Sequence, residues 1–203
     1  MKFLRVIAPA AALLVVACVK PVQVVQPLSA SMQNSPSMVA EVDVRLNPLA
    51  SEAMAKFEDK AREKRLAAGL APLDAASEPA DGTKREEYAT LPFAQMFELV
   101  VTDVTRDKGL NSGRPLRLAV EIDTLKTANA GMALLAGSND QLAGTVKVHD
   151  AQSDEMLGEF YVDVINSHSG LLGLAMRGGG IREELAEEFA LHISRQLTGK
   201  GKK

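Results

Sequence analysis

The sequence predicts a single two-layer α/β domain, in which helices cover one face of a mixed sheet of about four strands. Four segments alternate apolar and polar residues with the period of a half-buried strand. Three other segments repeat apolar residues at helical spacing. Every strand keeps one polar face, which is typical of a sheet that is covered on one side only. We place this domain at residues 38–198.

The strands are predicted from alternating residues. The first begins at Met38 and points one set of side chains inward: Ala40, Val42, Val44 and Leu46. Three more strands are expected at about 116–123, 142–149 and 157–165, with a turn at 150–154 between the last two. We expect these three to form an antiparallel meander.

Three helices are predicted from their apolar stripes. The first starts at Asn47 and Pro48, which suit a helix cap and a first turn. The second is expected from about Pro92 to Asp107, and the last from Ile181 to about Leu197. The second stripe is the clearest and consists of Phe93, Met96, Phe97, Val100, Val101 and Val104.

The first 17 residues have the pattern of a signal peptide. A basic start is followed by an apolar run from Val6 to Ala17, which is shorter than the roughly 20 residues of a membrane-spanning helix. The run ends on Val15-Val16-Ala17-Cys18, which resembles the lipobox of bacterial lipoproteins. That resemblance implies cleavage before Cys18 and attachment of lipid to its thiol and new amino terminus. Because position 19 is Val and not Asp, it also implies sorting to the outer membrane.

The cysteine count agrees with a lipid anchor. Cys18 is the one cysteine of the chain, and an exported protein with an unpaired thiol would enter an oxidising compartment. Lipidation would consume that thiol. The alternative is an ordinary secretory peptide with an incidental cysteine.

Residues 18–37 are predicted to be a flexible linker behind the lipidated cysteine, because Pro21, Pro27 and Pro36 lie among Ser, Gln and Asn. Such a segment would reach roughly 25 Å as a coil. The alternative is that the run from Val22 to Val25 forms an edge strand. Residues 199–203 are predicted to be a basic, disordered tail.

The composition excludes several function classes. A formal net charge of -3 and an aromatic content of 4% argue against nucleic-acid binding, and one Cys with three His argues against a Cys-rich zinc site. We expect no cofactor. Asp150 and Asp154 lack the other ligands of a calcium loop. Ser167, His168 and Ser169 place hydrolase residue types side by side without a nucleophile elbow, so we expect no enzyme.

Two apolar segments form the candidate site. In a meander, the loops that leave the second and the fourth strand lie at the same end of the sheet, here residues 127–140 and 167–180. They carry the candidate partner-binding residues Leu134, Leu135, Leu171, Leu172, Leu174, Met176 and Arg177. A contiguous exposed apolar patch usually marks an interaction site. The alternative is that the two loops pack on each other and close the core.

The layout of strand, helices, meander and last helix on a lipid-anchored chain is similar to small proteobacterial periplasmic lipoproteins of envelope assembly or of unknown function. The resemblance implies a non-catalytic factor on the periplasmic face of the outer membrane, held by lipid on Cys18 and bound to an envelope protein or to lipid. The sequence leaves the oligomeric state open. The alternative function is a binding protein for a small apolar or lipid-like ligand.

Overall fold

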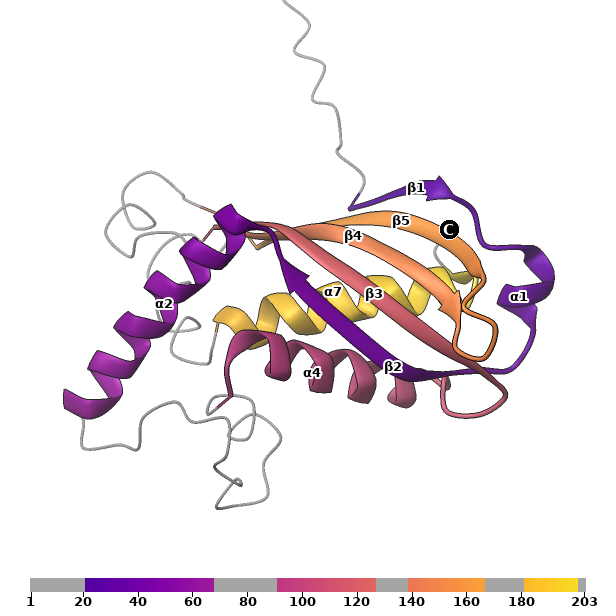
Figure 1. The fold of residues 1–203 in the computed structure, drawn as a ribbon, viewed down its shortest axis with the longest axis horizontal. Coiled ribbons are helices and arrows are strands. Elements are labelled where there is room, and N and C mark those ends of the chain that lie inside the picture. The colour runs from indigo at the N-terminus through magenta and orange to yellow at the C-terminus, as the bar shows by residue number, and fades with distance from the viewer. Residues whose placement is uncertain (1–20, 68–90, 127–138, 167–180, 201–203) are drawn as a thin grey trace, which may run out of the picture.

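The computed structural model describes residues 21–67, 91–126, 139–166 and 181–200, which form a sheet with helices packed on one face (Figure 1). The five strands are β1 (Val22–Gln26), β2 (Ser37–Leu46), β3 (Arg114–Lys126), β4 (Asp140–Asp150) and β5 (Met156–Asn166). The helices are α1 (Ala30–Asn34), α2 (Pro48–Ala67), α4 (Phe93–Asp107) and α7 (Ile181–Leu197).

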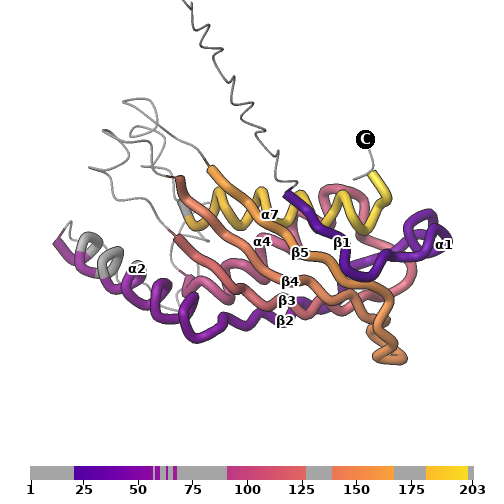
Figure 2. Tube along the Cα trace, turned by 90° about the horizontal axis from the view of Figure 1, so that it is seen from above, coloured from indigo at the N-terminus to yellow at the C-terminus, as the bar shows by residue number. Residues whose placement is uncertain are grey.

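The sheet is mixed, and its strand order is β1-β5-β4-β3-β2. Strands β3, β4 and β5 form the predicted antiparallel meander, while β2 pairs parallel to β3 and β1 pairs antiparallel to β5. Helices α4 and α7 lie side by side on one face of the sheet (Figure 2). The predicted two-layer α/β fold is therefore confirmed, with one strand more than the sequence indicated.

The core lies between the meander and the two helices α4 and α7. The predicted stripe of α4 is buried from Phe93 to Val101, and Val104 packs against it while partly exposed. Phe97 of α4 meets Phe189 of α7 edge to face, with ring centroids 5.3 Å apart. Such a pair adds about 0.5–1.5 kcal/mol to the free energy gained by burying the rings. The strands contribute alternate residues, as predicted, including Phe160, Val162 and Val164 of β5.

Each strand pairing of the described sheet has a register shift, and those in β2 and β3 matter most for the predicted alternation. In β2 the register changes between Val39 and Glu41, so that Val39 is buried and Ala40 is exposed. The prediction that Ala40 points inward was wrong, because the bulge adds one residue and reverses the phase of the strand. Val42, Val44 and Leu46 beyond the bulge still pack against the core.

The second bulge fixes the start of α2. The register of β3 changes between Ile122 and Thr124, which leaves the carbonyl of Asp123 to accept a hydrogen bond from Asn47 Nδ2 at 3.0 Å. Asn47 Oδ1 in turn accepts from the backbone N–H of Ala50 at 2.8 Å. Asn47 is therefore the predicted helix cap, and it also ties that cap to the sheet.

The flexible linker predicted for residues 18–37 is corrected over its described part. Residues 22–26 form strand β1, which was the alternative interpretation, and residues 30–34 form helix α1. Leu28 and Met32 are buried against the core. Residues 22–26 form a strand because they pair with the edge of β5. Five residues are too few for their own periodicity to predict that strand. Of the predicted tail, residues 201–203 lie outside the described residues.

Candidate functional site

The lipidation residue and the candidate partner-binding residues that the sequence singles out lie outside the described part of the chain. They are Cys18 for lipidation and, for partner binding, Leu134, Leu135, Leu171, Leu172, Leu174, Met176 and Arg177. His168 and its serine neighbours also lie outside it. What the structure describes is the part of the domain that flanks these segments.

The strand ends that flank the two apolar segments lie together. Lys126 at the end of β3 pairs with Gln141, and Asp140 at the start of β4 pairs with Asn166 at the end of β5. Helix α2 follows β2 at this same end, where Leu46 pairs with Ile122. We call this the loop end of the sheet, and the opposite end, with the turn between β4 and β5, the turn end. The predicted placement of both apolar segments at one end is thus confirmed for the residues on either side of them.

Glu58 of α2 joins three helices at the loop end. Its Oε1 accepts a hydrogen bond from the backbone N–H of Phe93 at 2.7 Å and lies 3.4 Å from Nη1 of Arg182. Pro92 gives α4 no side-chain cap, so Glu58 satisfies one of the free amides at the start of that helix. Arg182 of α7 also pairs with Glu183 at 3.2 Å, and its side chain is only 5% exposed. This cluster fixes the amino-terminal ends of α4 and α7 beside the loop end.

Two large apolar side chains are exposed near the loop end. Leu49, in the first turn of α2, is 76% exposed, and Ile165, near the end of β5, is 47% exposed. Ile165 is paired with Gln141 on the face of the sheet opposite the buried side chains of β5. Sequence analysis missed both residues, although the outward phase of Ile165 in its strand was available as a signal.

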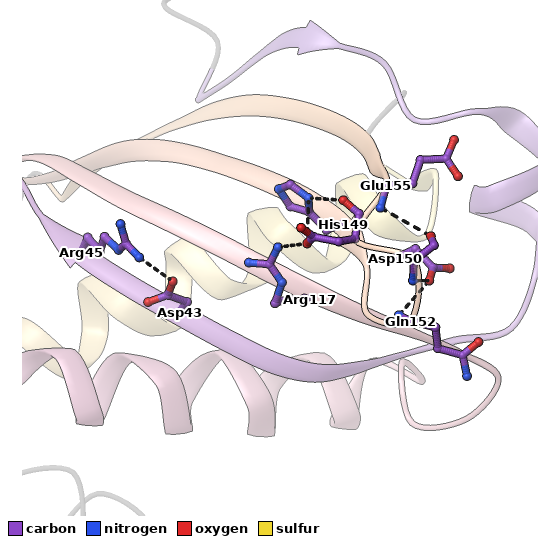
Figure 3. A network of polar contacts seen from close by, with 9 residues as sticks. Asp43, Arg45, Arg117, His149, Asp150, Gln152 and Glu155 are labelled. Atoms are coloured by element: carbon purple, nitrogen blue, oxygen red, sulfur yellow. Dashed lines mark hydrogen bonds and ion pairs between the residues drawn. The ribbon is translucent and has the colours of Figure 1, made fainter.

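Asp150 organises the turn end. Its Oδ1 accepts hydrogen bonds from the backbone N–H groups of Gln152 and Ser153 at 2.8 and 2.9 Å (Figure 3). Its Oδ2 accepts a hydrogen bond from Arg114 Nε at 2.6 Å. The amide of Ser153, with Arg114 and the amide of Gln152, holds the pKa of the Asp150 carboxyl well below its usual range. One carboxylate oxygen therefore holds the turn and the other joins it to the start of β3, and residues 150–154 form the hairpin turn that the sequence predicts.

The helix-free face near the turn carries a second polar cluster. Arg117 forms an ion pair with Asp154, and His149 Nδ1 lies 3.2 Å from the backbone oxygen of Asp154 (Figure 3). Asp154 has a φ of 60°, which a residue with a short polar side chain tolerates in a turn. These contacts give His149 a structural role in holding the hairpin against the sheet.

The histidine of α7 also has a structural environment. His192 is mostly buried, and its Nε2 lies 3.3 Å from a carboxylate oxygen of Glu188 one turn earlier. Burial lowers the pKa of His192, although Glu188 opposes that effect. Within the described residues, no group of three His, Cys, Asp or Glu side chains is arranged to hold a metal ion.

None of the helices in the described part of the chain is long and apolar enough to cross a membrane.

Comparison with known proteins gives distant likenesses in fold. No protein family matches the chain, and no curated protein matches it. Among solved structures, it is similar to the protein XCC0632 from Xanthomonas campestris, of the DUF330 family, with 13% identity, a TM-score of 0.45 and coverage of 86% of this chain and 91% of that one. It is also similar to PelC from Paraburkholderia phytofirmans, solved as a dodecamer, with 11% identity, a TM-score of 0.37 and coverage of 81% and 94%.

A third likeness is to a candidate lipoprotein from Caulobacter crescentus, with 17% identity, a TM-score of 0.32 and coverage of 53% of this chain and 85% of that one. At such identities and TM-scores these are distant similarities in fold, and they assign no activity to this chain.

Proposed function

We propose that this chain is a lipid-anchored protein of the outer membrane that faces the periplasm and acts without catalysis in envelope assembly or maintenance. The observation that carries the proposal is the sequence Val15-Val16-Ala17-Cys18 at the end of a short apolar run. Acyl chains on Cys18 would hold the protein stably, since each buried CH₂ group contributes about 0.8 kcal/mol.

The arrangement of the described residues supports an action through contacts. The strand ends that flank both apolar segments lie at the loop end, and the exposed Leu49 lies near the same end. Exposed apolar residues that gather in one place are typical of an interaction site. We propose that the loop end contacts an envelope protein or lipid through Leu134, Leu135, Leu171, Leu172, Leu174, Met176 and Arg177.

The anchor is tested by replacing Cys18 with Ser. We expect the native protein to have a mass that includes acyl chains and begins at Cys18, and to stay with the outer membrane on fractionation. The Cys18→Ser variant should carry no lipid and should leave that fraction or remain unprocessed. A bare thiol on Cys18 of the native protein would contradict the proposal. Unchanged membrane retention of the Cys18→Ser variant would contradict it as well.

The contact surface is tested with the double variant Leu135→Asp and Leu172→Asp. We expect it to stay folded and to lose partners that cross-link to the native protein in the envelope. The matched control is Leu66→Asp, which makes the same change at an exposed leucine near the end of α2. If the double variant unfolds while the control does not, the apolar segments belong to the core and the contact proposal fails.

A further inference from the structure

Strand β1 forms an outer edge of the sheet, and the segment that contains it carries no charge, although Glu159 and Asp163 lie on the neighbouring strand β5. Residues 21–40 contain no Asp, Glu, Lys, Arg or His, although 24% of the whole chain is charged. Val24 and Val25 of β1 are 53% and 65% exposed. We call the exposed residues of 21–36 the β1 strip. An uncharged strip with exposed valines is suited to contact with an apolar or lipid surface.

The β1 strip is fixed to the domain. Pro21 O accepts a hydrogen bond from the backbone N–H of Asp163 at 2.8 Å, and Val22 pairs with Val162. Beyond β1, Leu28 is buried against the glycine at position 158, and Gln33 Nε2 donates to the backbone oxygen of Gln196 at 2.9 Å. The strip therefore has a defined position along one edge of the sheet (Figure 1).

The chain between Cys18 and this fixed edge is short. Three residue steps separate Cys18 from Pro21, and three steps of an extended chain span at most about 11 Å. A lipid on Cys18 would therefore keep the start of β1 within about that distance of the bilayer surface. Lys20 is the one charged residue between Cys18 and Glu41, and a base is attracted to anionic phospholipid.

We propose that the β1 strip lies against the phospholipid surface that holds the acyl chains of Cys18, with Val24 and Val25 at the headgroups and the sheet standing on this edge. The inference rests on the lipid anchor of the proposed function and adds the orientation of the domain. An uncharged strip fits this position, because acidic side chains there would be repelled by anionic headgroups. Four strand spacings of about 4.8 Å then place β2 about 19 Å farther from the bilayer than β1.

The orientation is tested with single introduced cysteines, since the native thiol is consumed by the lipid. A thiol-reactive fluorophore is attached to Val25→Cys or Gln26→Cys on the strip. The same label on Arg45→Cys, in β2, is the matched control at the opposite edge. The lipidated proteins are placed in vesicles of phosphatidylethanolamine and phosphatidylglycerol whose acyl chains carry bromine near the headgroup. We expect both strip labels to lose most of their fluorescence and the Arg45→Cys label to keep it.

Equal quenching at both edges, or no quenching at the strip, would overturn the inference. Disulfide-linked pairs of the Val25→Cys protein without quenching would also overturn it, because they would show a second copy of the chain on the edge of β1. Mass measurement separates the two proposals. A lipidated Cys18 with an unquenched strip leaves the proposed function standing, whereas a bare thiol on the native protein removes the anchor and the orientation together.

Discussion

The two outer strands of the sheet differ in how their free edges are protected. Along β2, Asn111 bridges Met38, and the backbone of Val44 hydrogen-bonds to the carboxylate of Glu98 on α4. Burial of Glu98, with Asp43 nearby, raises the pKa of its carboxyl. The bulge of β2 and its charged residues Glu41, Asp43 and Arg45 add to this protection.

Strand β1 carries no charged residue of this kind, although its pairing with β5 also shifts register between Val24 and Gln26. Its five residues make it a short edge strand, which limits pairing, but it has no charge and its outer edge has no paired strand in the described sheet. Natural sheets protect exposed edges because unpaired backbone groups template association. Within the described residues, other parts of the chain cover the edge of β2, whereas no described strand pairs with the outer edge of β1, which we propose lies against the bilayer.

The largest effect is expected at the start of β2. Gly113 has a φ of 103°, and a Cβ there would lie 2.2 Å from the carbonyl oxygen of Pro36, which accepts the hydrogen bond of Arg114 N. Gly113→Ala should lower the free energy of unfolding by about 3 kcal/mol, from backbone strain and the clash together. Urea denaturation measures the change. A loss below about 1 kcal/mol would mean that the chain relaxes at little cost and that β2 is less firmly held than we infer.

A smaller effect is expected where β1 is held to the domain. Leu28→Ala removes the buried side chain that follows β1, and we expect a loss of about 2 kcal/mol, at the low end of the range for such truncations because the site lies at the edge of the core. Amide hydrogen exchange should rise in residues 22–34 and stay unchanged in β2. Uniform loss of protection across the sheet would show that β1 and α1 do not open independently.

A pH-dependent effect is expected at the turn end, where Arg114 joins the start of β3 to Asp150. Because the pKa of Asp150 is lowered in the folded state, its carboxylate stabilises the fold above the ordinary pKa of about 3.9, and the benefit is lost as the pH falls through the lower folded-state value. Asp150→Asn should be less stable than the native protein at pH 7. The difference should shrink below about pH 4. A constant difference from pH 7 to pH 2 would contradict this role.

Long periodic elements were predictable from the sequence, and short or irregular ones were not. The predicted last helix, Ile181 to Leu197, agrees with α7, because its apolar residues recur over 17 residues. Strand β1 has five residues and was assigned to a linker. The exposure of Ala40 was mispredicted because a bulge shifts the phase by one residue without a clear sequence signal.

The candidate site was predictable only in part. That the two apolar segments leave the same end of the sheet follows from the order of the meander strands, and their flanking residues confirm it. The junction of Glu58 and Arg182 joins residues 124 positions apart, and nothing in local periodicity connects them. The contact surfaces proposed at the loop end and along β1 remain predictions.

The smallest effect on stability is expected from removing the charges of β2, which makes that edge resemble β1. Glu41→Gln, Asp43→Asn and Arg45→Gln together should change the free energy of unfolding little, at most about 0.5 kcal/mol per exposed substitution. The ion pair of Arg45 and Asp43 lies on the surface, where such pairs contribute little. We expect the variant to associate more strongly with rising concentration in sedimentation velocity, because the charges no longer oppose edge pairing. Unchanged sedimentation would mean that the bulge and the cover from Glu98 and Asn111 protect the edge of β2 without its charges.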